Sequence, residues 1–150
     1  MMKVEKEANP ALVVDIEKDL RYISAIIKQK GRDILSHYPI TLPQFYALQW
    51  LLEEGDMTIG DLSNKLFLAC STTTDLVDRM EKSRLVMRVK DTNDRRVVRI
   101  HLLEEGKKII DEVIIKRQQY LQNIFEKFTG QEVELLKTSL SKLHQEMKHE

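Results

Sequence analysis

The chain has 150 residues, of which 24 are basic and 24 acidic, and therefore no net charge. With 42% hydrophobic and 32% charged residues and few glycines and prolines, it fits a helix-rich globular domain and excludes a disordered chain. No apolar run approaches the roughly 20 residues that span a bilayer, no signal-peptide stretch is present, and a single cysteine excludes an intramolecular disulfide framework. We therefore expect a cytoplasmic protein that does not contact a membrane.

Two helices are predicted in the first third of the chain. The second begins after Thr41, which can cap it, with Gln44 completing a capping box and Gly55 following its end. The first is long, amphipathic and ends near Ser36, because apolar residues recur mainly at steps of three and four: Leu12, Ile16, Leu20, Ile23, Ile27 and Ile34.

A helix-turn-helix is predicted next. Thr58 and Asp61 form a capping box at the start of its first helix, and the second helix runs from about Ser71 to Ser83. Two helices of this length joined by a tight turn are the arrangement found in helix-turn-helix motifs. The second helix should turn one face toward the core, made of Thr73, Leu76, Val77 and Met80.

A two-stranded hairpin with a charged tip follows, because the period of the hydrophobic pattern changes from helical to alternating. Apolar and polar residues alternate over 85–90 and 97–102, and the turn formers DTNDR separate the two runs. Between Arg79 and Arg99 there are eight basic and three acidic residues, so this segment carries +5 and the rest of the chain −5. A charge separation of this kind implies that one face meets a polyanion.

Two further helices complete the chain. The longest helical pattern runs from about Glu104 to Phe128, and Thr129 forms a capping box with Glu132 at the start of the last helix. The expected fold class is therefore mainly α with a small β-hairpin wing (α+β), in which a winged helix-turn-helix is flanked by helices from both ends of the chain.

This order of elements and three stretches of sequence resemble the MarR family of bacterial transcriptional regulators. The stretches are 42–52, 71–88 (STTTDLVDRMEKSRLVMR) and 91–106 (DTNDRRVVRIHLLEEG), and the last contains the hairpin's Asp-x-Arg as Asp94 and Arg96. The resemblance covers nearly the whole chain. It implies a single domain over 1–150, with a winged helix-turn-helix lobe over about 41–102 and dimerisation helices over about 10–36 and 104–149.

The resemblance also implies an obligate homodimer that binds double-stranded DNA. The second helix of each helix-turn-helix would enter a major groove, and each wing tip would reach the neighbouring minor groove. Two-fold symmetry then implies a palindromic operator with half-sites about one helical turn apart. Members of the family are most often repressors, and some bind aromatic anions, so we expect a repressor that is released by a small aromatic or anionic ligand or by another signal.

DNA contacts are expected from two elements. On the second helix of the motif, the face opposite the core carries Ser71, Thr72, Asp75 and Arg79. Asp75 can accept a hydrogen bond from a cytosine amino group or hold Arg79 one turn away, and we favour the second role. On the hairpin, contacts are expected from Arg88, Lys90, Asp94, Arg95, Arg96 and Arg99.

The hairpin residues are expected to have different roles. Arg88 and Arg99 lie on the strands and should mainly contact the phosphate backbone or attract it electrostatically. The resemblance places Arg96 in or at the minor groove, where A·T-rich segments concentrate negative potential. Asp94 cannot itself favour DNA, so it should hold Arg96 and the turn in one conformation.

The sequence departs from its relatives at four positions. Relatives commonly have glycine in place of Arg84, arginine in place of Asn93, and threonine or serine in place of Leu103. They often have a basic residue in place of Asp75. The changes at Asn93 and Asp75 favour the main alternative, a winged-helix protein-interaction module without specific DNA binding.

Other chemistry finds little support in the sequence. Cys70 opens the second helix of the motif, where a helix dipole can lower a thiol pKa, so a cysteine-based redox-sensing regulator is a further alternative. We expect instead that Cys70 is buried and inert. The four histidines have no metal-ligand spacing, and no nucleophile elbow, glycine-rich phosphate loop or apolar carboxylate pair occurs, so we expect neither an enzyme nor a metal or cofactor.

Overall fold

The computed structural model describes residues 9–149 and confirms a mainly helical fold with a small β wing. The chain divides into two compact units, one ending at Val113 and the other beginning at Ile114. None of the described helices is long and apolar enough to cross a membrane. The described elements are, in chain order, α1 (Pro10–Leu35), α2 (Leu42–Glu54), β1 (Met57–Thr58), α3 (Ile59–Leu66), α4 (Cys70–Lys82), β2 (Val86–Lys90), β3 (Val98–Leu102), α5 (Glu104–Phe125) and α6 (Gly130–Lys148).

Polar side chains cap the starts of α2, α3 and α6. At α2, the Gln44 backbone N–H donates to Thr41 Oγ1 at 3.3 Å, and the Thr41 N–H donates to Gln44 Oε1 at 3.0 Å. The start of α6 has the same reciprocal arrangement. At α3 only half of the expected box forms. The Asp61 N–H donates to Thr58 Oγ1 at 3.1 Å, but within residues 9–149 the Thr58 N–H donates no return bond to the Asp61 carboxylate, whose side chain is shorter than that of glutamate. The predicted starts of α2 and α6 are thus confirmed.

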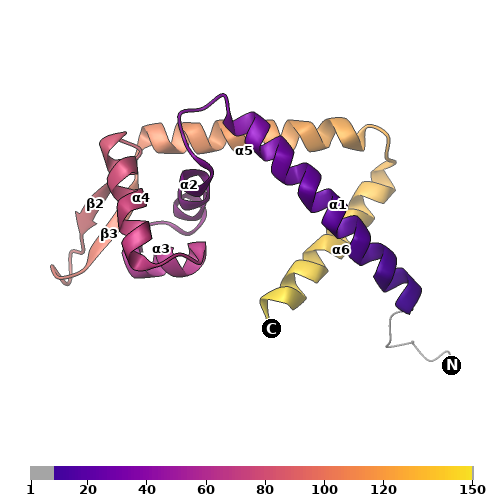
Figure 1. Cartoon of the computed structure of the whole chain (residues 1–150), viewed down its shortest axis with the longest axis horizontal. Coiled ribbons are helices and arrows are strands. Elements are labelled where there is room, and N and C mark those ends of the chain that lie inside the picture. Colours follow the sequence, from indigo (N-terminus) through magenta and orange to yellow (C-terminus); the bar gives the residue numbers. More distant parts are fainter. Residues whose placement is uncertain (1–8, 150) are drawn as a thin grey trace. The chain divides into compact units, whose positions relative to one another are not determined.

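The first unit contains a lobe made of α2, α3, α4 and a three-stranded antiparallel sheet of order β1–β3–β2 (Figure 1). In the hairpin, Val86 lies opposite Leu102 at the base, and Lys90 ends β2 near the tip. On the other side of β3, Met57 of β1 lies opposite Ile100. The sequence predicts only the hairpin, because a two-residue strand is too short to show an alternating pattern.

The core of the lobe lies between its helices and the sheet. The inward face predicted for α4 is confirmed at Thr73, Val77 and Met80, whereas Leu76 is only half-buried. The hydroxyl of Thr73 is buried without penalty because it donates to the Ala69 carbonyl at 3.0 Å. Side chains from several elements share this core: Leu48, Leu62, Val77, Met80, Val86, Ile100 and Ile110 are all fully buried.

The first turn of α5 packs directly on the backbone of the segment between α4 and β2. Leu103 N–H donates to the Leu85 carbonyl at 2.9 Å. A Cβ atom at Gly106 would lie 2.3 Å from the same carbonyl oxygen, well inside the 3.0 Å limit that real Cβ atoms respect. Glycine is therefore required at position 106 for this close approach.

The terminal helices expose much apolar surface. In α1 the buried residues, Gly31, Ile34 and Leu35, all lie near its C-terminal end. Along the rest of α1 the exposed apolar side chains are Leu12, Val13, Val14, Ile16, Ile23 and Ile26. Within Gly130–Lys148 no residue is buried, and Leu135, Leu140, Leu143 and Met147 are exposed. Exposed apolar surface of this extent is typical of sites that another protein covers.

Candidate nucleic-acid interface

The exposed face of α4 carries the helix residues that the sequence predicts for DNA contact. Ser71, Thr72, Asp75 and Arg79 are all exposed, while Thr73, Val77 and Met80 on the other side are buried. The helical period thus separates a packing face from a polar face with hydroxyls and one guanidinium. Hydroxyls and arginine can both bond to phosphate oxygens or to base edges.

The N-terminus of α4 is open to an anion. Its N-cap residue, Ala69, has no side-chain oxygen and makes no capping hydrogen bond. Its carbonyl accepts from Thr73, so the backbone N–H groups of the residues before Thr73 have no helical acceptor. Such N–H groups, together with the helix dipole, favour a phosphate at this position.

The pairing expected between Asp75 and Arg79 is not present. Within residues 9–149, neither side chain forms a hydrogen bond or an ion pair. Both side chains are exposed on α4, where an ion pair adds little stability because water solvates each charge instead. Arg79 is therefore unpaired on the polar face.

Arg88 joins the hairpin to α4. Its Nη1 lies 2.6 Å from Glu81 Oε1 and its Nη2 lies 2.6 Å from Asp78 Oδ1. The Arg88 backbone N–H also donates to Glu81 Oε2, at 3.0 Å. Burial disfavours the charged guanidinium, but the hydrogen bonds to Asp78 and Glu81 outweigh it and raise the Arg88 pKa. Through these two carboxylates Arg88 ties the hairpin to α4, while its side chain stays 29% exposed.

Asp91 organises the base of the hairpin tip. Its Oδ2 accepts from the backbone N–H groups of Asn93 and Asp94, both at 3.0 Å, and its Oδ1 lies 3.2 Å from Arg99 Nε. The Asp94 N–H, the Arg99 guanidinium and the Asn93 N–H stabilise the ionised form and lower the Asp91 pKa. Arg99, like Arg88, is thus engaged within the chain.

Asp94 holds Arg96 as the sequence predicts. Asp94 Oδ1 accepts from both the Arg96 backbone N–H at 3.0 Å and Arg96 Nε at 3.1 Å, and Oδ2 lies 3.1 Å from Nη2. The Arg96 side chain and its N–H together lower the Asp94 pKa. The Arg96 side chain is still 90% exposed, so the bidentate pair orients the guanidinium without covering it.

The positive charge of the segment 79–99 is concentrated in unpaired side chains. Arg88, Arg96 and Arg99 contact carboxylates, whereas five exposed cations form no ion pair within the described part of the chain. Two of the five were not among the predicted contacts: Lys82, the last residue of α4, and Arg84, two residues after it. The net positive charge seen in the sequence therefore corresponds to five side chains open to a polyanion, which are Arg79, Lys82, Arg84, Lys90 and Arg95.

The expectation of a buried Cys70 is wrong. Cys70 is exposed at the first position of α4, next to the turn after α3. Its Sγ lies 3.5 Å from the hydroxyl of Ser63. That expectation rested on how often small thiols are buried, whereas the buried face of α4 begins only at Thr73.

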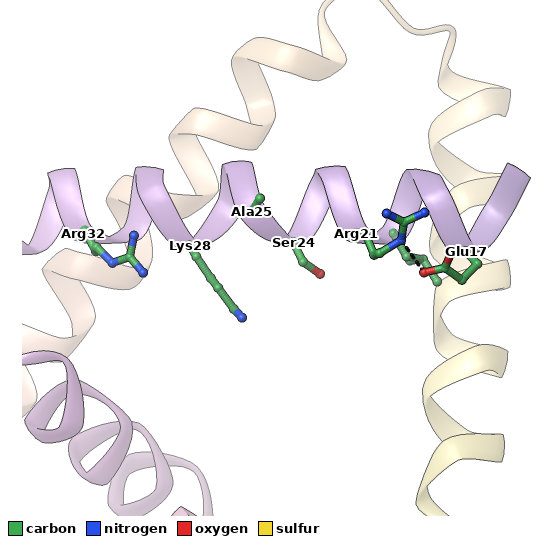
Figure 2. A pocket seen from close by; sticks show the side chains of 7 residues that line it. Glu17, Arg21, Ser24, Ala25, Lys28 and Arg32 are labelled. Atoms are coloured by element: carbon green, nitrogen blue, oxygen red, sulfur yellow. Dashed lines mark hydrogen bonds and ion pairs between the residues drawn. The ribbon is translucent and has the colours of Figure 1, made fainter.

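A shallow hollow of about 540 Å³ lies along one side of α1 (Figure 2). In Figure 2, Glu17 and Arg21 are joined by an ion pair, 2.6 Å between Oε2 and Nε. Lys28 and Ser24 extend from the same helix. The lining is basic overall and comes from α1 alone: Glu17, Leu20, Arg21, Ser24, Ala25, Lys28 and Arg32.

The fold and this interface define a winged helix-turn-helix protein of the kind that binds DNA. The model of the MarR family matches residues 40–98. The HTH-type transcriptional regulator YsmB of Bacillus subtilis (strain 168) is 67% identical over 136 residues, which cover 91% of this chain and 93% of that protein. A solved MarR family protein from Bacillus stearothermophilus is 60% identical with a TM-score of 0.89, over 95% of this chain and 99% of that one. The chain therefore belongs to the MarR family of transcriptional regulators, with the helix-turn-helix as its DNA-binding motif.

Two other solved structures with this fold contain bound molecules. A mutant of MepR from S. aureus, bound to an oligodeoxyribonucleotide, is 25% identical with a TM-score of 0.66, over 88% of this chain and 97% of that one. NadR in complex with 4-hydroxyphenylacetate is 29% identical with a TM-score of 0.67, over 95% of this chain and 97% of that one.

Proposed function

We propose that the protein acts as a homodimer that binds a palindromic operator and represses transcription until a signal releases it. The observation that carries this proposal is the set of five exposed, unpaired cations on α4 and the hairpin, in a chain whose total charge is zero. Clustered positive charges repel one another in solvent, and the phosphate backbone of DNA is a polyanion that would bind them. The MepR complex with an oligodeoxyribonucleotide supports DNA as the polyanion.

The residues of the interface divide into those that touch DNA and those that hold the others in place. Ser71 and Thr72 begin the helix that we place in the major groove. Arg96 is oriented by Asp94 and exposed, which suits insertion into a narrow minor groove. Phosphate contacts come from the unpaired cations Arg79, Lys90 and Arg95. Arg88 and Arg99 act as positioning residues, because carboxylates of the same chain already bind them.

Dimerisation is supported by the apolar surface of the terminal helices. The exposed leucine, isoleucine and valine side chains of α1, and the exposed leucine side chains of α6, would be unfavourable in water on a lone chain. A second copy of the same chain would cover them. Two-fold symmetry of that dimer would then place two copies of α4 on two half-sites of the operator.

An aromatic or anionic ligand is the release signal we propose. The side of α1 that forms the hollow carries Arg21, Lys28 and Arg32, which suit a carboxylate, and the NadR complex with 4-hydroxyphenylacetate shows an aromatic carboxylate bound to a protein of this fold. We expect 4-hydroxyphenylacetate, used as a probe, to raise the thermal unfolding temperature of the wild type and to do so less in Lys28→Ala. No shift in the wild type with a panel of aromatic carboxylates would contradict a ligand of this class.

The proposal is tested by selecting duplexes from random-sequence DNA with the wild-type protein and footprinting the selected sites. We expect a two-fold symmetric sequence protected over two half-sites about one helical turn apart. In a transcription assay the selected site should lower the yield when placed over a promoter. Selection that enriches no sequence, together with no binding at low salt, would instead favour the protein-interaction module.

The exposure of Cys70 keeps redox sensing as the second candidate function. An exposed thiol at the start of the recognition helix would lie near DNA, where an oxidised sulfur could disturb the contact. We expect low peroxide to affect DNA binding by wild type and Cys70→Ser alike. Thiol-reversible release of the wild type only would make the protein a redox-sensing regulator.

A further inference from the structure

Phe67 is an unusual residue in the turn of the helix-turn-helix. The residue is 94% exposed, the highest value among the exposed large hydrophobic residues of the described chain. Its backbone is in the left-handed region, with φ of 55°. A bulky non-glycine residue in this conformation is uncommon and unfavourable.

The turn itself does not need an aromatic side chain. Phe67 ends α3: its N–H donates to the Asn64 carbonyl at 3.4 Å, and the Leu68 N–H donates to the Ser63 carbonyl at 3.1 Å. Both bonds are made by the backbone. Glycine or asparagine forms such a helix end more easily. The exposed ring of Phe67 therefore gives the fold no stabilisation that would offset the unfavourable backbone conformation.

The surroundings of Phe67 indicate what it contacts. Leu68, Ala69 and Cys70 are exposed as well, and they lead directly into Ser71 and Thr72 on the polar face of α4. With about 3.3–3.6 Å per extended residue, the Cα of Phe67 lies within about 11 Å of the Cα of Cys70. The apolar turn is thus continuous with the proposed DNA-binding surface and adjoins the open helix N-terminus that favours a phosphate.

We propose that Phe67 contacts a thymine methyl group in the major groove and contributes to sequence specificity there, an inference that rests on the proposed DNA binding. The C5-methyl of thymine is the apolar group that a base pair offers in the major groove, and phenylalanine is among the side chains that recognise it. Burial of the ring against the methyl group removes from water an apolar surface that is uncovered in the free protein.

The test compares wild type, Phe67→Ala and Phe67→Gly on the duplex that the wild type selects, using fluorescence anisotropy. Phe67→Ala should bind at least about tenfold more weakly, because two dimer-related contacts are lost. Replacing the contacted thymine with deoxyuridine in both half-sites should weaken the wild type by a similar factor and leave Phe67→Ala unchanged. Phe67→Gly should also bind weakly, while its thermal unfolding temperature is equal to or above that of the wild type, because glycine relieves the backbone conformation.

Two results would overturn the inference. The first is DNA binding by Phe67→Ala that is as tight as that of the wild type; if regulation is then lost, the ring is assigned to a protein partner. The second is an unchanged wild-type affinity when deoxyuridine replaces every thymine of the half-sites, which would assign the ring to deoxyribose. A wild type that binds no duplex even at low salt would contradict the proposed function itself, which separates the two failures.

Discussion

Arginines on the wing have different surroundings, and these surroundings predict different effects on DNA binding. Arg96 is held by Asp94 and points a preorganised guanidinium to solvent, whereas Lys90 is an exposed, unpaired point charge. The pairing of Asp94 with Arg96 could be predicted because both residues lie within two positions of one turn. The partners of Arg88 could not, because Asp78 and Glu81 belong to a different element and reach it only after the lobe has folded.

Arg96→Ala should therefore reduce operator affinity more than Lys90→Ala, and its effect should be larger on A·T-rich flanks than on G·C-rich flanks. Lys90→Ala should weaken binding to all sequences alike, since it loses only a phosphate contact. Anisotropy titrations on duplexes that differ only in their flanks measure both effects. Equal losses for the two variants on every flank would show that the hairpin attracts DNA without reading the groove.

The lowered pKa of Asp91 determines how the stability of the wing depends on pH. Hydrogen bonds from the Asp94 N–H, Arg99 and the Asn93 N–H lower this pKa in the folded protein. The stabilisation by ionised Asp91 is therefore complete above the unfolded pKa of about 3.9 and is lost as the pH falls through the lower folded pKa. Asp91→Asn should therefore differ from the wild type at neutral pH, with faster amide exchange at Asn93 and Asp94, and the difference should vanish below that folded value. NMR titration measures the Asp91 pKa directly, and a midpoint at or above the ordinary aspartate value would contradict the assigned role.

Elements with strong local periodicity or capping signals could be predicted from the sequence, whereas elements that depend on long-range contacts could not. The caps at Thr41 and Thr129 and the inward face of α4 were predictable from local pattern alone. β1 was missed because only its pairing with β3 makes it a strand. In β2 the alternating pattern did not show which of the two alternating sets of side chains faces the core: Val86 is buried, while Met87 and Val89 are exposed.

Position 106 links two elements in a way that a substitution can test. Gly106→Ala should destabilise the protein by about 1–3 kcal/mol or more, because the added methyl would meet the Leu85 carbonyl and the backbone must shift. Gly60→Ala is the matched control in α3, where only Thr58 Oγ1 comes within 4 Å, at 3.8 Å, and it should be neutral or stabilise by up to about 1 kcal/mol. Urea unfolding of both variants gives the comparison. Equal stability for the two would mean that the contact of α5 with Leu85 is looser than described.

The proposed dimer would bury apolar surface that a single chain leaves exposed. Leu140 in α6 is 49% exposed and has no buried neighbour within its own helix. Leu140→Glu should dissociate the dimer in sedimentation and weaken operator binding, because a carboxylate would have to be buried at the subunit contact. Ser141→Glu places the same charge on the adjacent residue and should remain dimeric. A Leu140→Glu protein that sediments as a stable dimer would locate the interface elsewhere.

We propose that α4 and the wing bind the phosphates and grooves of duplex DNA through their unpaired cations. The most direct measurement is the affinity for the selected duplex over a series of salt concentrations, for wild type and for Lys90→Ala/Arg95→Ala. We predict tight binding at low salt, a steep linear fall of log affinity with log salt, and a slope flatter by about one unit for each phosphate contact removed. A wild-type affinity that does not change with salt, or a slope that the double substitution leaves unchanged, would contradict this mode of binding.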